Sequence, residues 1–392
     1  MRIIFDARCV FRGKGGIGRY ARGLLEALAW REPPHEFVVI LSGVSPLDSL
    51  SLPDQFELFA APTGMIDETW EQLHLPTALD HWGADLYFNP TFATPLLADC
   101  LRVSTIHDVV FERHPELVEP GLRAYLSRAS RLTAEHADLV LTVSEFSKGE
   151  ICEVYGLDPS RVRVVYNGVD ARFHSAEVAP KRAEELRGEL RLPPDTPFLL
   201  YVGAVEPKKN IENLLRAFAR ARERIPHMLV LAGGQGGMPW RPEDVIRELD
   251  LMESVRLVGY VPDELVAELM NLADGFLYPS LYEGFGLPPL EAMACGTPTL
   301  VSNASSLPEV VGDGALKVDP RDVDEMAEGI KRLATDEELR SELTRSGRER
   351  AGEFTWERAA QGVLSVFEEL ASQDARGTAS DQGANTSSGT DQ

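Results

Sequence analysis

The chain has few cysteines and no long apolar segment. Its 392 residues include four cysteines, none of them in a C-x-x-C pair, and these are Cys9, Cys100, Cys152 and Cys295. Their scatter is typical of reduced thiols and provides no structural zinc spacing. No run reaches the roughly 18 consecutive apolar residues of a membrane span, and the strand-like start at 2–5 is not the apolar core of a signal peptide. We therefore expect a cytoplasmic protein.

A surplus of basic residues is also missing. The 39 lysines and arginines are outnumbered by 62 aspartates and glutamates, which gives a formal net charge of -23. An envelope this acidic repels nucleic-acid phosphates at long range. We therefore expect no nucleic-acid partner.

Short β-branched runs alternate with helical patterns along most of the chain, and its length predicts two domains. We expect strands at 2–5, 36–41, 85–88, 101–106, 138–143, 161–166, 198–202, 227–232, 255–258, 275–278, 298–301 and 315–318. Strands that alternate with helices predict parallel sheets covered on both faces. The expected fold class is therefore α/β, with two doubly wound, Rossmann-like domains facing each other across a cleft.

One interruption of this pattern divides the chain. Residues 171–197 carry many charges, contain no strand pattern and end in prolines, which indicates an interdomain linker. We predict an N-terminal domain at 1–172, a C-terminal domain at 190–355 and a packed amphipathic helix at 356–372. Residues 373–392 are rich in Gly, Ser, Asp and Gln, and we expect them to be disordered.

The segment FRGKGGIGRY contains the spacing G-x-G-x-x-G at Gly13, Gly15 and Gly18. A dinucleotide site needs the first glycine directly after the first strand and an acidic residue at the end of the second strand. Both conditions fail here, because the first glycine comes eight residues after Phe5 and the second strand ends in Leu-Ser-Gly. An ordinary flexible turn accounts for the glycines equally well. The loop still follows the first strand, so the backbone amides of Gly15 and Gly16 are candidate phosphate or substrate contacts.

The run PSLYEGFGLPPLEAMAC at 279–295 carries a stronger signal. A strand leads into a glycine turn, and Pro288 then occupies the first turn of a helix, where proline is favoured. The amides around Gly284, Phe285 and Gly286 are thereby placed at a helix N-terminus, which attracts an anion such as a diphosphate.

Two carboxylates, Glu283 and Glu291, flank this turn at a spacing of eight residues. Carboxylates beside a phosphate site are costly unless they accept hydrogen bonds from hydroxyl groups, and sugar hydroxyls are the obvious partners. Two other interpretations remain open. The pair could be a first-turn acid and a solvated loop residue, or it could be the acid and nucleophile of a glycoside hydrolase.

Two further segments are expected to end strands at the same cleft. In GAVEPKKN, Asn210 is placed to cap a helix at 211–224, and Lys208 and Lys209 would stabilise charge on a leaving phosphate. Surface lysines that flank a turn are the alternative. In TIHD, His107 would reach the reacting sugar, or it would simply be satisfied by Asp108.

Together these segments resemble the retaining glycosyltransferases of family 4, which have the GT-B fold. The resemblance runs from GGIGRY through TIHD, TVSEFSK, YNGVD, YVGAVEPKKN and GYVPDE to SLYEGFGLPPLEAMACGTP, where Glu283 and Glu291 form the family's E-x7-E element. The resemblance implies that Glu291 binds the donor's ribose and that Glu283 lies by the transferred sugar. It also implies that His107 contacts this sugar.

The same resemblance implies the remaining contacts. The amides of Phe285 and Gly286 would meet the diphosphate, which Lys209 neutralises, and the C-terminal helix would cross back to the N-terminal domain. The nucleotide base is expected near Gly233, Gly234, Tyr260 and Val261. Many relatives have an arginine where this chain has Ala204, so the second cationic role is transferred to Lys208, although lysine lacks the fork of arginine.

A metal is not expected. The spacing D-x-D occurs only at Asp322 and Asp324, in a context that indicates a helix N-terminus, where the dipole favours acids. The lysines and helix amides would supply the positive charge instead.

The predicted function is transfer of a hexosyl unit, with retained configuration, from a nucleoside-diphosphate sugar to an acceptor hydroxyl. The EPKKN segment most resembles bacterial mannosyltransferases of surface polysaccharide assembly, so GDP-mannose is the expected donor and a saccharide or lipid-linked acceptor the expected partner. Alternatives are a sugar-nucleotide epimerase, an NAD-dependent oxidoreductase and a non-catalytic sugar-nucleotide binder. Peripheral membrane contact is a further hypothesis, carried by Arg123, Arg128 and Arg131 on a helix at 121–136.

Overall fold

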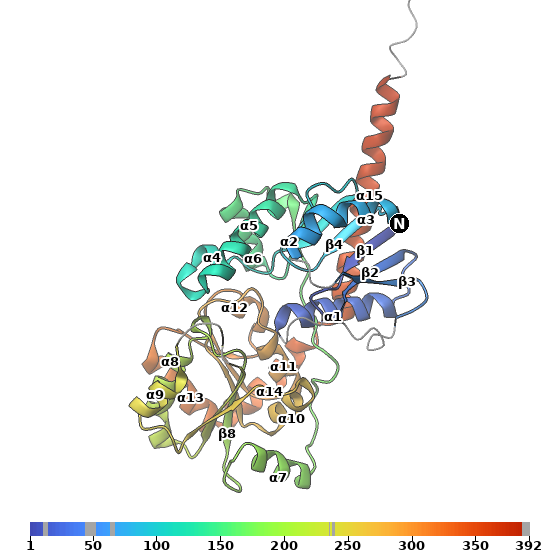
Figure 1. Ribbon diagram of the computed structural model, residues 1–392. Coiled ribbons are helices and arrows are strands. Elements are labelled where there is room, and N and C mark those ends of the chain that lie inside the picture. Colours follow the sequence, from blue (N-terminus) through green and yellow to red (C-terminus); the bar gives the residue numbers. More distant parts are fainter. Residues whose placement is uncertain (11–14, 44–51, 63–66, 235, 237–239, 386–392) are drawn as a thin grey trace, which may run out of the picture.

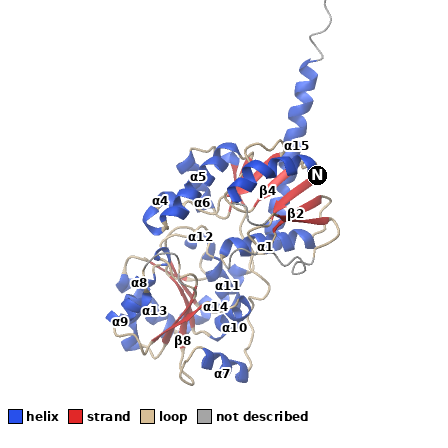
Figure 2. Ribbon diagram, in the orientation of Figure 1, coloured by secondary structure: helices blue, strands red, loops and turns tan. Residues whose placement is uncertain are grey.

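The computed structural model describes residues 1–10, 15–43, 52–62, 67–234, 236 and 240–385. Two α/β bodies lie one above the other in Figure 1, and each has a sheet with helices packed around it (Figure 2). The chain crosses between the bodies after β7 and again at the last helix.

The first sheet has seven strands in the order β3-β2-β1-β4-β5-β6-β7, and every pair in it is parallel. Its strands are β1 (Arg2–Asp6), β2 (Glu36–Ser42), β3 (Phe56–Ala61), β4 (Leu86–Asn89), β5 (Leu101–Thr105), β6 (Leu139–Thr142) and β7 (Val162–Val164). The helices of this body are α1 (Gly16–Trp30), α2 (Asp67–Thr69), the π-helical turn η2 (Trp70–His74), α3 (Leu75–Trp82), α4 (Val110–Arg113), α5 (Pro120–His136) and α6 (Glu145–Tyr155).

The second sheet has six parallel strands in the order β10-β9-β8-β11-β12-β13. They are β8 (Phe198–Val202), β9 (Met228–Ala232), β10 (Val255–Gly259), β11 (Gly275–Tyr278), β12 (Thr299–Ser302) and β13 (Leu316–Val318). Its helices are α7 (Pro180–Glu189), α8 (Ile211–Ala221), α9 (Pro242–Glu248), α10 (Asp263–Leu272), α11 (Leu287–Cys295), α12 (Leu307–Val311), α13 (Val323–Thr335) and α14 (Glu337–Ala351). Strands such as FLLYV are buried along their whole length, as sheets covered on both faces require.

The last helix, α15 (Trp356–Asn385), returns to the first body and packs against α1. A Cβ on Gly23 would lie 2.3 Å from the Trp356 ring, so a glycine is needed where the two helices meet. The helix continues beyond residue 372, where the sequence pattern predicted its end, and its last turns project from the body (Figure 1). Residues 386–392 lie outside the described part of the chain.

One strand was not predicted. β3 lies at the edge of the first sheet, and its burial alternates only weakly along FELFAA. The sequence pattern of a buried strand is therefore absent from this segment. The segment forms a strand by pairing in parallel with β2, with Phe56 opposite Phe37.

Each strand order has one point at which it reverses direction along the sheet. In the first sheet this switch point lies between β1 and β4, and in the second it lies between β8 and β11. Ligands of open parallel sheets bind at the carboxyl ends of the strands at such points. The residues at and just after the ends of β1, β4, β8 and β11 therefore define where the site should be.

Candidate active site

Both switch points open into one cavity of about 810 Å³ between the two bodies, here called the central cavity. Asp6 and Asn89 end β1 and β4 on one side, while Val202 and Tyr278 end β8 and β11 on the other, and all four line the cavity. The predicted site residues that line this central cavity are Gly15, Gly16, His107, Lys208, Lys209, Glu283, Gly284, Phe285 and Gly286.

The start of α11 faces the central cavity. Gly286 is its N-cap with φ of 107°, and a proline occupies the first turn, as the sequence predicts. Gly286, Leu287 and Pro288 all line the cavity. The amide end of this helix and its dipole are thus directed at a space bounded by both bodies.

Gly284 is a point of close approach between the bodies. A Cβ on this glycine would lie 2.3 Å from the carbonyl oxygen of His107. The Oγ of Ser144, at the start of α6, donates a hydrogen bond to the Gly284 carbonyl at 2.7 Å. The glycine turn therefore forms part of the contact that holds the two halves of the site in register.

Lys209 and Glu283 form a buried ion pair at the cavity wall. Lys209 Nζ lies 2.6 Å from Glu283 Oε1 and donates a second hydrogen bond to the Tyr278 hydroxyl at 2.7 Å. Both charged side chains are only 10% exposed. Burial alone would raise the pKa of Glu283, but Lys209 and Lys208 outweigh burial, so the pKa lies below its ordinary value. Glu283 is therefore held in its ionised form, and the two lysines balance its negative charge.

Lys208 is the more accessible of the two lysines, with 22% of its side chain exposed, and its Nζ lies 3.6 Å from Glu206. Both lysines belong to a single 3-10 turn, Pro207–Lys209, directly before α8. Asn210 occupies the N-cap position of α8, but its side chain makes no cap hydrogen bond. The predicted cap is therefore wrong, because the Asn210 amide instead donates to the carbonyls of Pro279 and Pro320 and fixes the lysine turn against the second sheet.

His107 is buried between two aromatic rings, those of Tyr20 and Phe92. Its Nε2 lies 2.9 Å from the Pro90 carbonyl oxygen, which can only accept a hydrogen bond, so Nε2 carries the proton and Nδ1 is the acceptor. Burial lowers the pKa of His107 despite this hydrogen bond and the charge of Asp108. The Asp108 carboxylate accepts from the Val110 amide instead, so the alternative of a histidine satisfied by Asp108 is wrong.

Glu291 does not line the central cavity but a neighbouring one of about 450 Å³, here called the side cavity. Its carboxylate is held by Arg19 of α1, with Nη1 at 2.8 and 3.0 Å from the two oxygens. The other arm of Arg19 binds Asp263 of α10 at 2.7 Å. Burial raises the pKa of Glu291, and Arg19 offsets part of this increase.

Only some of the residues expected around the nucleotide base line a cavity. Tyr260 lines the side cavity together with Glu291 and is 46% exposed. Gly233 and Val261 line neither of these cavities. Gly233 instead packs backbone to backbone, since a Cβ on it would lie 1.7 Å from the Gly203 carbonyl oxygen. Gly13, the first glycine of the spaced triplet, lies outside the described residues.

A buried charge cluster on the floor of the central cavity was not predicted. Arg8 Nη2 binds Asp6 at 2.7 Å and Glu71 at 2.8 Å, and the Tyr87 hydroxyl donates to Asp6 at 2.8 Å. Burial lowers the pKa of Arg8, but the two carboxylates and Tyr87 outweigh it and raise the pKa overall. The position of Asp6 and Arg8 directly at the end of the first strand was the available signal.

The D-x-D spacing has the structural role that its context indicates. Asp322 is the N-cap of α13 and accepts hydrogen bonds from the Asp324 and Glu325 amides. Asp324 pairs with Arg220. Within the described ranges, no group of three or more His, Cys, Asp or Glu side chains has an arrangement that could hold a metal ion.

Two facing Rossmann-like sheets that share one cavity at their switch points define the GT-B class of protein. Residues 182–350 match the family model described as glycosyl transferases group 1, and residues 14–173 match that of glycosyltransferase family 4. The O-antigen chain mannosyltransferase B of Escherichia coli is 31% identical, over 94% of this chain and 100% of its own length. The serotype-specific mannosyltransferase WbdA of Escherichia coli is 28% identical, over 91% of this chain and 46% of its own length.

Solved structures agree with this class. The sucrose-phosphate synthase of Thermosynechococcus elongatus has a TM-score of 0.75 at 23% identity, over 94% of this chain and 99% of its own. Anabaena HepE in complex with UDP-glucose also has a TM-score of 0.75, at 21% identity, over 94% and 100% of the two chains. The two family models and the 31% identical relative show that the chain belongs to glycosyltransferase family 4, and the solved structures show that it has the GT-B fold. No helix in the described part of the chain has both the length and the apolar character needed to cross a bilayer.

Proposed function

We propose that this enzyme transfers a mannosyl unit from GDP-mannose to a hydroxyl of a saccharide acceptor, with retention of the anomeric configuration and without a metal ion. The observation that carries the proposal is the convergence of His107, Lys209, Glu283 and the start of α11 on one cavity. Mannosyl transfer is favoured because the two curated relatives described above are both mannosyltransferases by name.

The diphosphate is assigned to the start of α11. The amides at the start of α11 and the helix dipole would stabilise the charge that grows on the leaving group. Lys208 would add a cation from the end of β8, the strand next to β11 in the same sheet. Lys209 would help to neutralise the diphosphate while it stays paired with Glu283. A diphosphate oxygen that approaches its Nζ would share this cation with the carboxylate. The arrangement replaces the charge that a divalent metal supplies in other glycosyltransferases.

The sugar is assigned to the space between Glu283 and His107. Glu283 is bound to Lys209 and carries a lowered pKa, so it is suited to accept hydrogen bonds from sugar hydroxyls rather than to attack carbon. In the proposed reaction the bond between the anomeric carbon and the phosphate oxygen breaks, and the bond to the acceptor oxygen forms on the same face. The acceptor proton passes to the departing diphosphate.

The side cavity is assigned to the ribose and base. Glu291 would accept hydrogen bonds from the ribose hydroxyls, and Tyr260 offers an exposed ring beside it. Because Arg19 occupies the Glu291 carboxylate, the ribose would share this carboxylate with Arg19 or displace it.

We also propose that the enzyme is cytoplasmic. The four cysteines form no disulfide with one another in the described part of the chain, as is usual in a reducing compartment. A lipid-linked acceptor and peripheral membrane contact remain predictions. Of the three arginines of α5 named for that contact, Arg128 pairs with Glu68 and Arg131 lies over the Tyr155 ring, while Arg123 is exposed.

A panel of nucleotide sugars tests the donor. Ligands that bind only the native state raise the melting temperature, so GDP-mannose should give the largest increase among GDP-, UDP- and ADP-sugars. Glu291→Gln should reduce that increase, and an undiminished increase would contradict the ribose assignment. Incubation of GDP-mannose with the enzyme and a mannoside in the presence of EDTA should yield an α-linked product. Release of GDP and an altered free sugar without any acceptor would instead indicate the epimerase alternative, which the relatives do not favour.

A further inference from the structure

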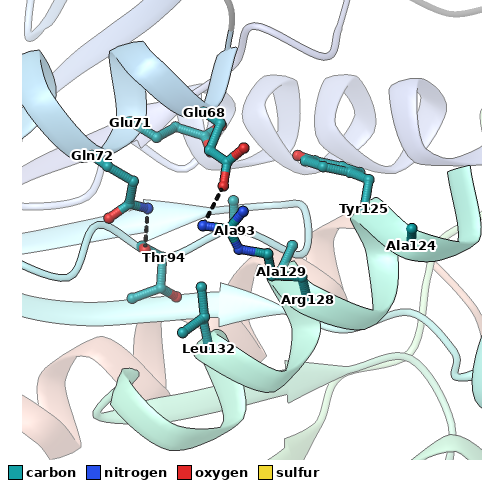
Figure 3. A pocket seen from close by; sticks show the side chains of 10 residues that line it. All are labelled: Glu68, Glu71, Gln72, Ala93, Thr94, Ala124, Tyr125, Arg128, Ala129 and Leu132. Atoms are coloured by element: carbon teal, nitrogen blue, oxygen red, sulfur yellow. Dashed lines mark hydrogen bonds and ion pairs between the residues drawn. The ribbon is translucent and has the colours of Figure 1, made fainter. Parts of the chain in front are cut away.

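A further cavity, of about 310 Å³, lies within the N-terminal body between η2 and α5. We call it the α5 cavity, and Figure 3 shows the side chains that line it. Its size is at the lower end of the range of about 300 to 1,000 Å³ in which small-molecule sites fall. No part of the donor is assigned to this cavity.

The α5 cavity adjoins the central cavity. Glu71 and Tyr125 line both, so Tyr125 stands on the boundary between them and Glu71 contributes to a shared floor. Along α5, Leu122 and Leu126 face the central cavity, whereas Ala124 and Arg128, four residues apart, face the α5 cavity. Neighbouring stripes of one helix therefore line two adjacent binding spaces.

The wall opposite α5 is cross-linked by hydrogen bonds. The Gln72 amide is bonded at both ends, because its nitrogen donates to the Thr94 carbonyl at 2.9 Å and its oxygen accepts from the Leu96 amide at 3.0 Å. Thr94 Oγ1 lies 2.7 Å from Ser104 Oγ. These satisfied groups fix the shape of the cavity and leave its binding chemistry to other side chains.

Three side chains supply that chemistry, and they point toward one another in Figure 3. Glu68 and Arg128 form an ion pair at 3.1 Å across the cavity, with 43% and 70% of their side chains exposed. Tyr125 is 42% exposed beside them. An exposed ion pair is weak and can exchange its partners for ligand hydroxyls, which accept from a guanidinium and donate to a carboxylate.

This combination matches a sugar ring better than an anion or a lipid. The charges of Glu68 and Arg128 balance each other, so the cavity does not select a phosphate. A pyranose ring has polar edges for the ion pair and an apolar face for the Tyr125 ring. The apolar part of the wall consists of three alanines and a single leucine, Leu132, which together provide little area for an acyl chain.

We propose that the α5 cavity binds the second sugar ring of an oligosaccharide acceptor whose terminal ring lies in the central cavity. This inference rests on the proposed function, because it extends the acceptor side of the same site. The enzyme is thereby assigned an acceptor of at least two saccharide units, joined across the boundary at Tyr125 and Glu71.

The test compares acceptors of increasing length with the donor selected by the nucleotide-sugar panel. The probes are methyl α-mannoside, mannobiose and mannotriose, and the readout is the acceptor KM. With the wild-type enzyme we expect KM to fall at least tenfold from the monosaccharide to the disaccharide. Arg128→Ala and Ala124→Trp should abolish this fall while leaving KM for methyl α-mannoside within about twofold of the wild-type value.

Two controls keep the result interpretable. Arg123→Ala removes a charge from the same helix outside all three cavities and should retain the full length dependence. Donor hydrolysis by water and the donor-induced increase in melting temperature should be unchanged in every variant. Failure of the wild-type enzyme to bind the donor would count against the proposed function. Intact donor hydrolysis with an acceptor KM that does not depend on acceptor length would count against the α5 cavity alone.

Other outcomes also overturn the inference. The α5 cavity is not an acceptor subsite if Arg128→Ala and Ala124→Trp retain the fall in KM, or if none of the three saccharides accepts a mannosyl unit while the donor is cleaved. If α5 bound a lipid surface instead, Arg123→Ala and Arg128→Ala would weaken binding to phosphatidylglycerol vesicles equally, and neither would change the dependence on acceptor length.

Discussion

Arg19 of the N-terminal body forms an ion pair with Glu291 of the C-terminal body, with its Nη1 at 2.8 and 3.0 Å from the two carboxylate oxygens. Glu291 is only 3% exposed and Arg19 25%. This pair connects α1, which begins directly after Gly15 and contains Gly18, with α11, whose start faces the central cavity. The carboxylate assigned to the ribose is thus also an interdomain contact.

Arg19→Ala should lower the free energy of unfolding by about 2 to 3 kcal/mol near pH 7, since it leaves a buried carboxylate without its cation. The pKa of Glu291 is already raised in the folded protein, so protonation favours the folded state and the unpaired charge destabilises it as pH rises. The destabilisation should therefore be larger at pH 7 than at pH 5. Urea unfolding at both pH values measures it, and the double variant Arg19→Ala/Glu291→Gln should recover much of the loss. An equal loss at both pH values would argue that Arg19 acts through packing.

Gly284→Ala should reduce kcat/KM at least a hundredfold with little loss of secondary structure. The new Cβ would lie 2.3 Å from the His107 carbonyl oxygen, which is backbone and cannot move aside without separating the two halves of the site. Gly149→Ala is the matched control, because a Cβ added to this glycine of α6 would meet no atom within 4 Å. This change should raise the free energy of unfolding by about 0.5 to 1 kcal/mol, since alanine is favoured over glycine in a helix. Wild-type activity in Gly284→Ala would show that the close contact is not needed for turnover.

Lys209→Met should destabilise the protein by about 3 to 5 kcal/mol, because Glu283 would be left buried without its partner. Adding Glu283→Gln to Lys209→Met should restore much of the stability but none of the activity, since both groups are assigned to the donor site. Thermal melts and initial rates of the single and double variants separate the two effects. Recovery of activity in the double variant would remove the pair from the reaction.

The lowered pKa of His107 predicts a pH dependence of stability. In the unfolded chain this histidine titrates near its ordinary value, about 6.5, and in the folded protein it titrates lower, so the unfolded state binds the proton more readily. Stability should therefore fall as pH decreases below about 6.5. His107→Gln retains a donor for the Pro90 carbonyl and should lose less stability than the wild type over that range. Parallel curves of melting temperature against pH for the two proteins would contradict this explanation.

The sequence predicted the parts of the site that follow from local chain geometry. The start of α11 was predictable because a strand, a glycine turn and a proline in sequence order determine where the helix begins. The lysine turn and His107 were predictable because each closely follows a strand, and parallel strands end at the same edge of a sheet. The edge strand β3 was missed, since much of its surface faces solvent and its pattern is weak.

Contacts between distant segments were not predictable in the same way. Arg19 and Glu291 are 272 residues apart, and nothing in the sequence around either one indicates the other. The cluster of Arg8, Asp6 and Glu71 depends on where η2 packs against the end of β1. The Asn210 amide was expected to cap a helix, but it bonds two carbonyls that the tertiary fold brings to it.

The central claim is that the donor diphosphate is bound at the start of α11, beside Lys208 and Lys209. A crystal structure of the enzyme with GDP measures this directly. We expect diphosphate oxygens about 3 Å from the backbone amides of Phe285 or Gly286, with a lysine Nζ in contact with the same group. A diphosphate bound away from the start of α11, or one held through a metal ion by carboxylates, would contradict the claim.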